Sequence, residues 1–227
     1  MSRVRLTVVT VLAGIAVLTA CSSRSDGPNS ASSKGDSDKP VTAPAAKPIT
    51  KELAQADITQ ALLGDGETLP GWSLHGDKDV TDGEYCNSSD NDFTPAGWVR
   101  GGDSSYEYNG STENMAFVHI CLFDSVKSAT KAYTTWKGTE TSKQQAPKPP
   151  VGSESTLVIN PGASEDTVYG FTRSGRANIR VKVEGGTGDD PSGAQAMLSA
   201  TLKRLQQLQD GKSATVTAPD ELAAAKP

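Results

Sequence analysis

The spacing of apolar residues changes several times along the chain, and each change predicts a different element of secondary structure. Between Thr50 and Gly64 apolar residues recur at helical spacing, which predicts a helix with Thr50 as its N-cap and Gly64 just beyond its end. A short extended piece is expected at residues 72–75. Residues 76–97 are rich in Gly, Asp, Asn and Ser and predict a long irregular region.

A β-hairpin is predicted next. Residues Ser104–Tyr108 and Glu113–Phe123 flank the dipeptide Asn109-Gly110, which supplies the positive φ angles that a tight hairpin turn requires. The returning strand is apolar at both alternating sets of positions, as is typical of a strand covered on both faces. We therefore expect this strand in the centre of the sheet.

A helix and a short strand are predicted after this hairpin. Asp124 is expected to cap a helix that runs to about Lys137 with one apolar stripe along it. The segment 145–152 holds three prolines and is expected to be a loop, which is followed by a strand at residues 156–159. The stripe on the helix consists of Val126, Ala129, Tyr133 and Trp136.

A second hairpin is predicted with Ser174-Gly175 as its two-residue turn. In that register Val168 lies opposite Val181, and the face that includes both is apolar and points into the core. A shift by one residue would mix the apolar and polar sets, which favours this pairing. The other face carries Tyr169, Phe171, Arg173, Arg176, Asn178, Arg180, Lys182 and Glu184.

The last predicted helix starts at Asp190-Pro191, because proline is favoured in a first helical turn, and it ends at Gly211. Together these elements predict an α+β fold, in which a mainly antiparallel sheet is packed by helices in a single domain over residues 50–211. Residues 212–227 have low complexity and are predicted to form a disordered tail.

The chain opens with a pattern typical of an exported protein. Arg3 and Arg5 precede an uncharged apolar run of about 13 residues, whose helical length of roughly 20 Å is too short for a hydrocarbon core of about 30 Å. The run ends in Leu18-Thr19-Ala20-Cys21, which resembles the lipobox of bacterial lipoproteins. We expect residues 1–20 to be a lipoprotein signal peptide and Cys21 to be lipidated. The alternative is an ordinary cleaved signal peptide with a chance cysteine.

A tether and a location follow from this start. Residues 22–48 consist almost entirely of Ser, Asp, Lys, Pro, Gly and Ala, so residues 21–49 are predicted to be a lipidated, disordered tether. Removing Arg3 and Arg5 with the signal peptide takes away two positive charges and shifts the formal net charge from −5 to −7. Such an acidic body is not expected to bind nucleic acid. The expected location is the cell membrane, lipid-anchored and facing the extracytoplasmic side.

The three cysteines fit the same location. With Cys21 acylated, Cys86 and Cys121 remain as an even pair in an oxidising compartment, which favours a disulfide between them. Such a bond would close a loop of about 36 residues and stabilise the fold by about 3–4 kcal/mol. Two buried thiols or a metal-binding pair are the alternatives. Because the sequence has no second Cys/His pair at ligand spacing, a zinc site is not expected.

One surface is a candidate binding face. The predicted outer face of the second hairpin combines aromatic and cationic side chains, a combination that suits anionic ligands or partner proteins. An ordinary solvent-exposed face on a hairpin near the sheet edge is the alternative. The residues of this possible binding face are Tyr169, Phe171, Arg173, Arg176 and Arg180.

Other kinds of chemistry are not favoured by the sequence. The acidic segment 77–88 does not match a calcium-binding loop, because its fifth and sixth positions are Thr81 and Asp82. His119 lies on the apolar strand and is expected to be a core residue, whereas His75 lies in a loop. Two histidines without a matching nucleophile motif do not form a catalytic triad. No enzymatic activity, metal or cofactor is therefore expected.

The order of these elements resembles a known group of proteins. The stretches at 61–72 and 116–136, together with the closing strand pair and helix, look like those of actinobacterial surface lipoproteins similar to the extracellular sensor domain of PknH-type receptor kinases. The resemblance covers roughly residues 50–210. It implies an α+β sensor-like domain with a cleft, stabilised by disulfides, that binds a ligand without catalysis.

The predicted function is that of a lipid-anchored envelope lipoprotein with a non-catalytic ligand-binding or sensor-like domain. Its expected partners are the membrane, through the lipid anchor, and an unknown small ligand or envelope protein. An envelope assembly or protein-interaction module without a small ligand is the first alternative. A secreted hydrolase is the second.

Overall fold

The structure is a computed structural model that describes residues 47–87, 93–162, 166–185 and 190–225. It confirms the predicted α+β fold: seven strands form one sheet in the order β1-β2-β3-β7-β6-β5-β4, and each neighbouring pair in that order is antiparallel. The strands are β1 (Trp72–Thr81), β2 (Trp98–Tyr108), β3 (Ser111–Phe123), β4 (Lys143–Gln145), β5 (Glu154–Asn160), β6 (Thr167–Ser174) and β7 (Ala177–Glu184).

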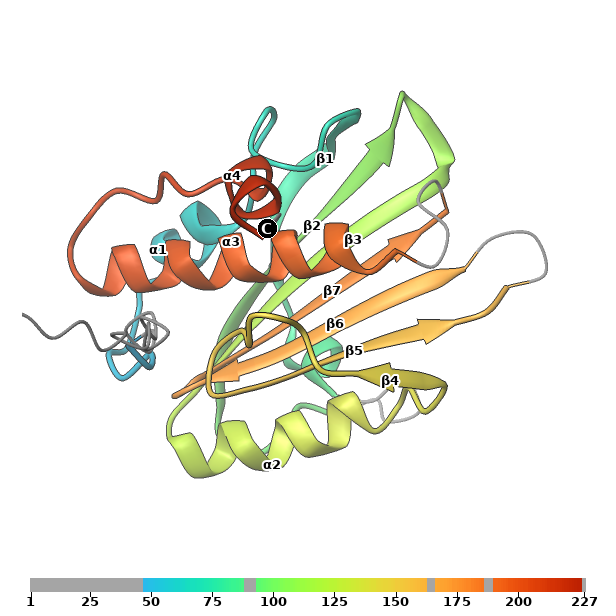
Figure 1. Cartoon of the computed structure of the whole chain (residues 1–227). Helices are drawn as coiled ribbons and strands as arrows, with labels where there is room; N and C mark the ends of the chain where they lie inside the picture. Colours follow the sequence, from blue (N-terminus) through green and yellow to red (C-terminus); the bar gives the residue numbers. More distant parts are fainter. Residues whose placement is uncertain (1–46, 88–92, 163–165, 186–189, 226–227) are drawn as a thin grey trace, which may run out of the picture. The chain divides into compact units, whose positions relative to one another are not determined.

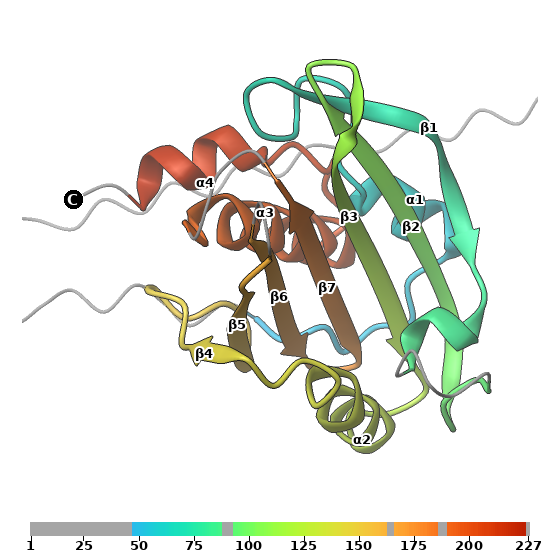
Figure 2. The same ribbon diagram turned by 90° about the vertical axis from the view of Figure 1, so that its right-hand side faces the viewer.

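Helices cover the two faces of the sheet unequally (Figures 1 and 2). The larger apolar core forms on one face, beneath α1 (Gln55–Ala61), α3 (Ser192–Gln209) and α4 (Ala218–Ala224). On the other face α2 (Val126–Lys137) lies at one end of the strands and packs on a smaller core. A short 3₁₀ helix, η1 (Gly83–Cys86), also lies against this second face, joined to β3 by a disulfide between Cys86 and Cys121.

The β2–β3 hairpin has the predicted turn. Asn109 and Gly110 have φ angles of 50° and 73°, and positive values are what a two-residue turn between antiparallel strands requires. The end of β3 is buried on both faces, as predicted. The central strand of the sheet, however, is β7 and not β3, because β7 is the fourth of the seven strands in order and β3 is the third.

The β6–β7 hairpin is shifted by two residues from the predicted pairing. Val168 lies opposite Val183, because the turn consists of Gly175 and Arg176. Gly175 has a φ of 60°, and a Cβ at this position would lie 2.0 Å from the carbonyl oxygen of Ile49. A shift by an even number of residues leaves the two faces of the hairpin unchanged, so the predicted division into an apolar and a polar set still holds.

The first helix, α1, starts later than predicted, with Ala54 rather than Thr50 as its N-cap. Residues 47–53 form a non-helical strap instead. In this strap, Ile49 is fully buried and its carbonyl oxygen accepts a hydrogen bond from the Arg176 amide at 2.8 Å. The strap is therefore bonded to the β6–β7 turn rather than wound into a helix.

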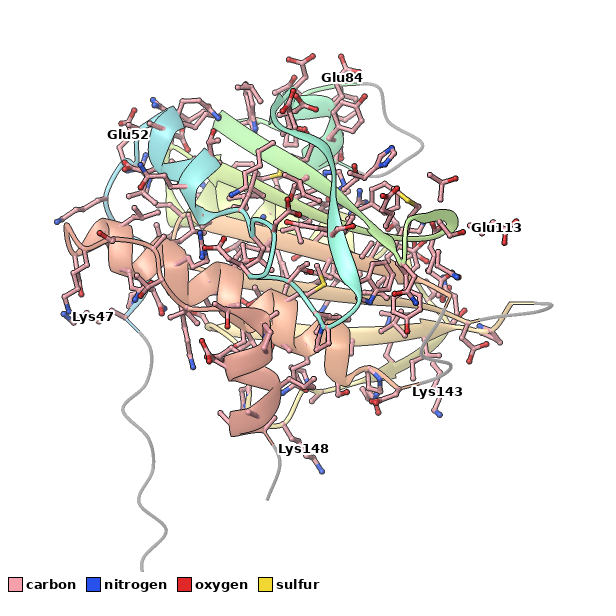
Figure 3. All side chains as sticks on the ribbon, turned by 90° about the horizontal axis from the view of Figure 1, so that it is seen from above. Lys47, Glu52, Glu84, Glu113, Lys143 and Lys148 are labelled. Carbon is pink, nitrogen blue, oxygen red and sulfur yellow. A yellow bond between two sulfur atoms is a disulfide. The ribbon has the colours of Figure 1, made fainter. Side chains whose placement is uncertain are left out.

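The strap is also fixed to the end of α3. Figure 3 shows Lys47, where the described chain begins, beside this end of the helix, and its ammonium lies 3.6 Å from the Asp210 carboxylate. The side-chain oxygen of Gln209 accepts hydrogen bonds from the amides of Thr50 and Lys51 at 2.6 and 3.0 Å. The strap thus joins the central hairpin to the last long helix.

Two strands extend the predicted sheet. β1 runs to Thr81, past its predicted end at His75, because pairing with β2 resumes after an irregularity between His75 and Asp79. The expected irregular region is therefore shorter at its start. The short strand β4 was not predicted, and it pairs with β5 at the sheet edge.

α2 follows its predicted course apart from its first turn. The N-cap is Ser125 rather than Asp124, and the Ser125 hydroxyl accepts a hydrogen bond from the Ser128 amide at 3.1 Å. Val126 is 48% exposed and so does not belong to the buried stripe. The buried stripe consists of Ala129, Ala132, Tyr133 and Trp136.

The prediction of a disordered tail over residues 212–227 is wrong for the described part of that segment. There α4 packs on α3: Ala218 is fully buried and Leu222 contacts the main core. The Glu221 carboxylate accepts a hydrogen bond from the Lys203 ammonium on α3 at 2.7 Å. A few apolar side chains suffice to hold a short helix when they meet the surface of an existing one, since tertiary packing supplies most helical stability.

Candidate functional site

The candidate site lies on the second face of the sheet, beside α2. The strand register places four side chains in one row across this face: Asp103 on β2, His119 on β3, Arg180 on β7 and Phe171 on β6. Directly opposed residues of antiparallel strands have Cβ atoms about 4.5–5.5 Å apart. Each member of this row therefore adjoins the next.

A second row crosses the same face two residues further along the strands. It contains Phe117 on β3, Lys182 on β7 and Tyr169 on β6. The Lys182 ammonium lies 5.6 Å from the centre of the Phe117 ring and 5.9 Å from that of Tyr169. It also pairs with the carboxylate of Glu184 on its own strand. The second row is therefore an aromatic surface whose central charge is already balanced.

α2 covers the first row with Trp136. The Arg180 guanidinium lies over the Trp136 indole, 5.0 Å from the ring centre, and the indole meets the Phe171 ring nearly edge-on at 6.1 Å. Close by, the Asn178 side chain donates a hydrogen bond to the Ala129 carbonyl oxygen at 2.9 Å. This bond ties β7 to α2 and so holds the indole over the row.

The predicted disulfide is present and brings another ring to the row. Cys86 and Cys121 are bonded, with Cα atoms 5.9 Å apart, and both are fully buried. Cys121 lies two positions from His119 on the same face of β3. The bond therefore holds the short 3₁₀ helix Gly83–Cys86 against this strand and places Tyr85 over His119. The two rings stack at 6.4 Å with 13° between their planes.

Arg180 carries its positive charge in a partly buried position, which is unfavourable for a charged group. Burial lowers the pKa of its guanidinium, although an arginine remains protonated in proteins. Glu140 and Tyr169 favour the charged form electrostatically. The buried Nε atom nevertheless has no hydrogen-bond partner among the described residues.

His119 contributes a neutral ring. Burial lowers its pKa to about 3, and the positive charges of Arg180 and Lys182 act in the same direction. Its Nδ1 atom is buried and finds no partner in the described part of the chain. On the β2 side, burial raises the pKa of Asp103. The first row therefore combines the Arg180 cation and an uncharged His119 with the Asp103 carboxyl at its β2 end.

The structure brings together three of the five residues of the predicted binding face. Tyr169 and Phe171 stack in parallel at 6.2 Å, and Phe171 lies opposite Arg180. Phe171 is fully buried beneath α2, however, so the expectation that it lies on an exposed face is wrong. The reason is that α2 and the disulfide cover this half of the face.

The other two arginines of the predicted face lie apart from this group. Arg173 is held by the carboxylate of Glu154, whose Oε1 lies 2.5 Å from its Nη2. Arg176 lies in the β6–β7 turn, where its Nε donates to the carbonyl oxygen of Phe123 at 2.7 Å. The predicted lipidation site, Cys21, lies outside the described residues.

His75 does not join the site. His75 lies on the edge strand β1, and its Nδ1 is 2.9 Å from the Glu107 carboxylate on β2. Across β2 its row leads to Phe117, two residues from His119, so His75 lies about 12 Å from His119. The described residues contain no group of three or more His, Cys, Asp or Glu side chains that could hold a metal ion.

Two cavities lie elsewhere on the domain. One of about 410 Å³ lies between the proline-rich loop and the start of α3, and one of about 170 Å³ lies between α2 and the loop before β2. The linings are Gln145, Ala146, Lys148, Leu157, Pro191 and Gln195 for the first, and Asn87, Phe93, Pro95, Ala96, Ser128, Lys131, Ala132 and Thr135 for the second.

Several residues of the site were not predicted to belong to it, among them Trp136, His119 and Tyr85. Trp136 was expected in the core, and it does lie there, but the sequence did not indicate that it covers Arg180. His119 and Tyr85 carried a usable signal. His119 shares a strand face with Cys121, and Tyr85 adjoins Cys86, so a disulfide between the cysteines implies that the two rings lie close together.

No helix in the described part of the chain is long and apolar enough to span a membrane.

No protein-family model matches the chain, and no curated protein matches it. The chain is similar in structure to the crystal structure of the extracellular domain of PknH from Mycobacterium tuberculosis, with a TM-score of 0.48 and 10% sequence identity. The similarity covers 74% of this chain and 100% of that one. At this level of identity it says nothing about the site or the function.

Proposed function

We propose that the protein is a lipid-anchored lipoprotein of the cell envelope whose folded domain binds a ligand on the extracytoplasmic side without catalysing a reaction. The observation that carries the proposal is the row of charged and aromatic side chains beside α2, where the buried Nε of Arg180 has no partner among the described residues. Leaving a buried charged group unpaired is costly, and such groups concentrate at functional sites. The ligand would bind on the part of the second sheet face beside α2.

The proposed location is supported by the sequence and by the disulfide. The lipobox at residues 18–21 and the polar segment after it have the pattern of an anchor and a tether. Cys86 and Cys121 form a fully buried disulfide, and such bonds persist in oxidising compartments such as the extracytoplasmic space.

Replacing Cys21 by serine is expected to release the protein from the membrane, because a hydroxyl cannot form the thioether to diacylglycerol. Mass spectrometry should show the loss of the acyl mass, and cell fractionation should move the protein from the membrane to the soluble fraction. Ser22→Ala is the matched control and should change neither result. An acylated, membrane-bound Cys21→Ser protein would contradict the anchor.

A ligand should raise the melting temperature of the full mature chain. Binding to the native state alone adds about 2.7 kcal/mol at a ligand concentration of 100 Kd, and each kcal/mol corresponds to about 2–4 °C for a protein of this size. The screen should include envelope lipids, neutral glycans and anionic metabolites. The ligand-binding proposal fails if no compound shifts the melting temperature while affinity purification recovers a stable envelope protein.

A protein-interaction module is the second candidate function. Three large apolar side chains of the 3₁₀ helix, the loop before β2 and the start of α2 are exposed: Tyr85 by 58%, Phe93 by 61% and Val126 by 48%. Exposed apolar side chains that gather on one surface are typical of interaction sites. A partner that binds there would be the one recovered by affinity purification.

A further inference from the structure

Arg180 differs from the other arginines of the described domain. Arg100, Arg173, Arg176 and Arg204 each donate to a carboxylate or carbonyl oxygen at 3.1 Å or less. Within the described residues, the side chain of Arg180 takes part in no hydrogen bond or ion pair, and its guanidinium contacts the Trp136 ring. Among the residues that the structure describes, the fold therefore gives four guanidinium groups at least one acceptor each and gives that of Arg180 none.

We propose that Arg180 is an anion-binding residue and that the ligand carries a carboxylate or phosphate group that binds to it. The inference rests on the proposed function, because it concerns the same face and names the class of ligand. A guanidinium does not lose its proton in proteins, so the group that satisfies it has to be an acceptor, and a negative charge satisfies it best.

The surroundings of Arg180 limit how a ligand can reach it. The Trp136 indole covers one side of the guanidinium, whose central carbon lies over the ring, so a ligand has to reach the N–H groups from another side. These groups form a planar fork that matches two oxygens of one carboxylate or phosphate group. A bidentate anion that approaches along the edge of the guanidinium is therefore the expected mode of binding.

Two neighbouring nitrogens favour the same ligand. Trp136 Nε1 and His119 Nδ1 are buried and have no partners in the described ranges of the chain. An indole nitrogen can only donate, and a neutral imidazole donates from one of its two nitrogens. The residues of this row therefore include several nitrogens without acceptors in the described chain, and a ligand rich in acceptors would suit them.

The local charges point in the same direction. Lys182 is paired with Glu184, and His119 is uncharged at neutral pH. The Glu140 carboxylate favours the charged form of Arg180, but the two side chains form no ion pair among the described residues. The charge of Arg180 is therefore the one that an incoming anion would neutralise.

The first test measures anion binding by the full mature chain. Calorimetric titration with inorganic phosphate and with acetate should show saturable binding of at least one of them. Arg180→Gln should weaken this binding about tenfold or more, since hydrogen bonds to charged groups are among the stronger ones. Arg180→Lys keeps the charge without the planar fork and should give an intermediate affinity. The matched control is Arg173→Gln, which removes a paired arginine of the same hairpin face and should leave binding unchanged.

A second test separates an anion-binding role from a structural one. Without added anion, Arg180→Met should melt at the temperature of the wild type or about 2–4 °C higher, because replacing an unpaired buried charge by an apolar side chain is neutral or stabilising. Phosphate and acetate should not shift its melting temperature. A clear loss of stability in Arg180→Met would show that the guanidinium serves the fold, and would overturn the inference.

The source of the anion is decided with vesicles. The Cys21→Ser chain, which has no anchor of its own, is mixed with vesicles of phosphatidylglycerol or of phosphatidylcholine. Binding that requires both phosphatidylglycerol and Arg180 assigns the anion to a lipid headgroup, whereas binding of free phosphate or acetate assigns it to a solute. Absence of both, or anion binding unchanged by Arg180→Gln, overturns the inference. A neutral ligand from the thermal screen that binds Arg180→Gln normally would leave the proposed function standing without the anion.

Discussion

Replacing Arg204 by methionine is expected to lower the free energy of unfolding by about 3–5 kcal/mol. The Arg204 side chain is 4% exposed, and it donates to the carbonyl oxygens of Ala61 and Gln60 at 3.1 and 2.8 Å. It also bonds the Val216 carbonyl oxygen at 3.2 Å and lies 3.0 Å from the Glu67 carboxylate. Methionine has a similar length but no donors, so these acceptors would lose their partner in the protein interior.

The adjacent Lys203 provides the matched control for this experiment. Its side chain is 47% exposed and pairs with Glu221 at 2.7 Å. Because exposed ion pairs contribute about 1 kcal/mol or less, Lys203→Met should change the unfolding free energy by no more than that. Urea unfolding followed by circular dichroism measures both variants. If Arg204→Met fell within about 1 kcal/mol of the wild type, the joint between α1, α3 and the segment before α4 would not depend on this guanidinium.

Removing the disulfide is expected to cost about 3–4 kcal/mol of stability. The Cys86–Cys121 bond spans a sequence separation of 35 residues, and a loop of that length restricts the unfolded chain by about this amount. The double variant Cys86→Ala, Cys121→Ala keeps the position apolar and avoids placing hydroxyl groups in the smaller core. Tyr85 should also lose its fixed position over His119. A ligand should therefore raise the melting temperature of this variant less than that of the wild type.

Reductant provides an internal control for the disulfide. It should shift the urea midpoint of the wild type towards that of the double variant and leave the midpoint of the double variant unchanged. A wild-type midpoint that is insensitive to a reductant, after thiol labelling has confirmed reduction, would show that the bond does not restrain the unfolded chain as expected.

The elements that were predicted correctly are those for which the spacing of apolar residues and the residues at the turns indicate the same structure. Asn109-Gly110 fixes the β2–β3 hairpin, and Pro191 and Gly211 enclose α3. The β6–β7 turn was misplaced because two neighbouring dipeptides can each form a tight turn. The one that is used is selected by the close approach of Ile49 to Gly175, which is a tertiary contact. α4 was missed for a similar reason, since its apolar residues are few and depend on α3.

For the candidate site, the sequence predicted on which face of its strand each residue lies, but not which element covers that face. Alternation along β6 and β7 places Tyr169, Phe171 and Arg180 on one face, as predicted. The apolar stripe of α2 shows that Trp136 is buried, but it does not show against which face of the sheet. That choice decides whether Phe171 is exposed, and whether Arg180 lies in water or under an indole ring. Which layer covers a polar strand face depends on the whole topology and not on the strand.

The strap at the start of the domain also has a mechanical consequence. The carbonyl oxygen of Ile49 accepts a hydrogen bond from the Arg176 amide. Arg176 lies just before the central strand β7 and four positions before Arg180. If the chain is anchored at Cys21, a pull on the tether would enter the domain at the strap and strain the β6–β7 turn first. A force between the lipid anchor and a bound partner would then act on the strand that carries Arg180. The affinity for a ligand at Arg180 would therefore change with mechanical tension in the envelope.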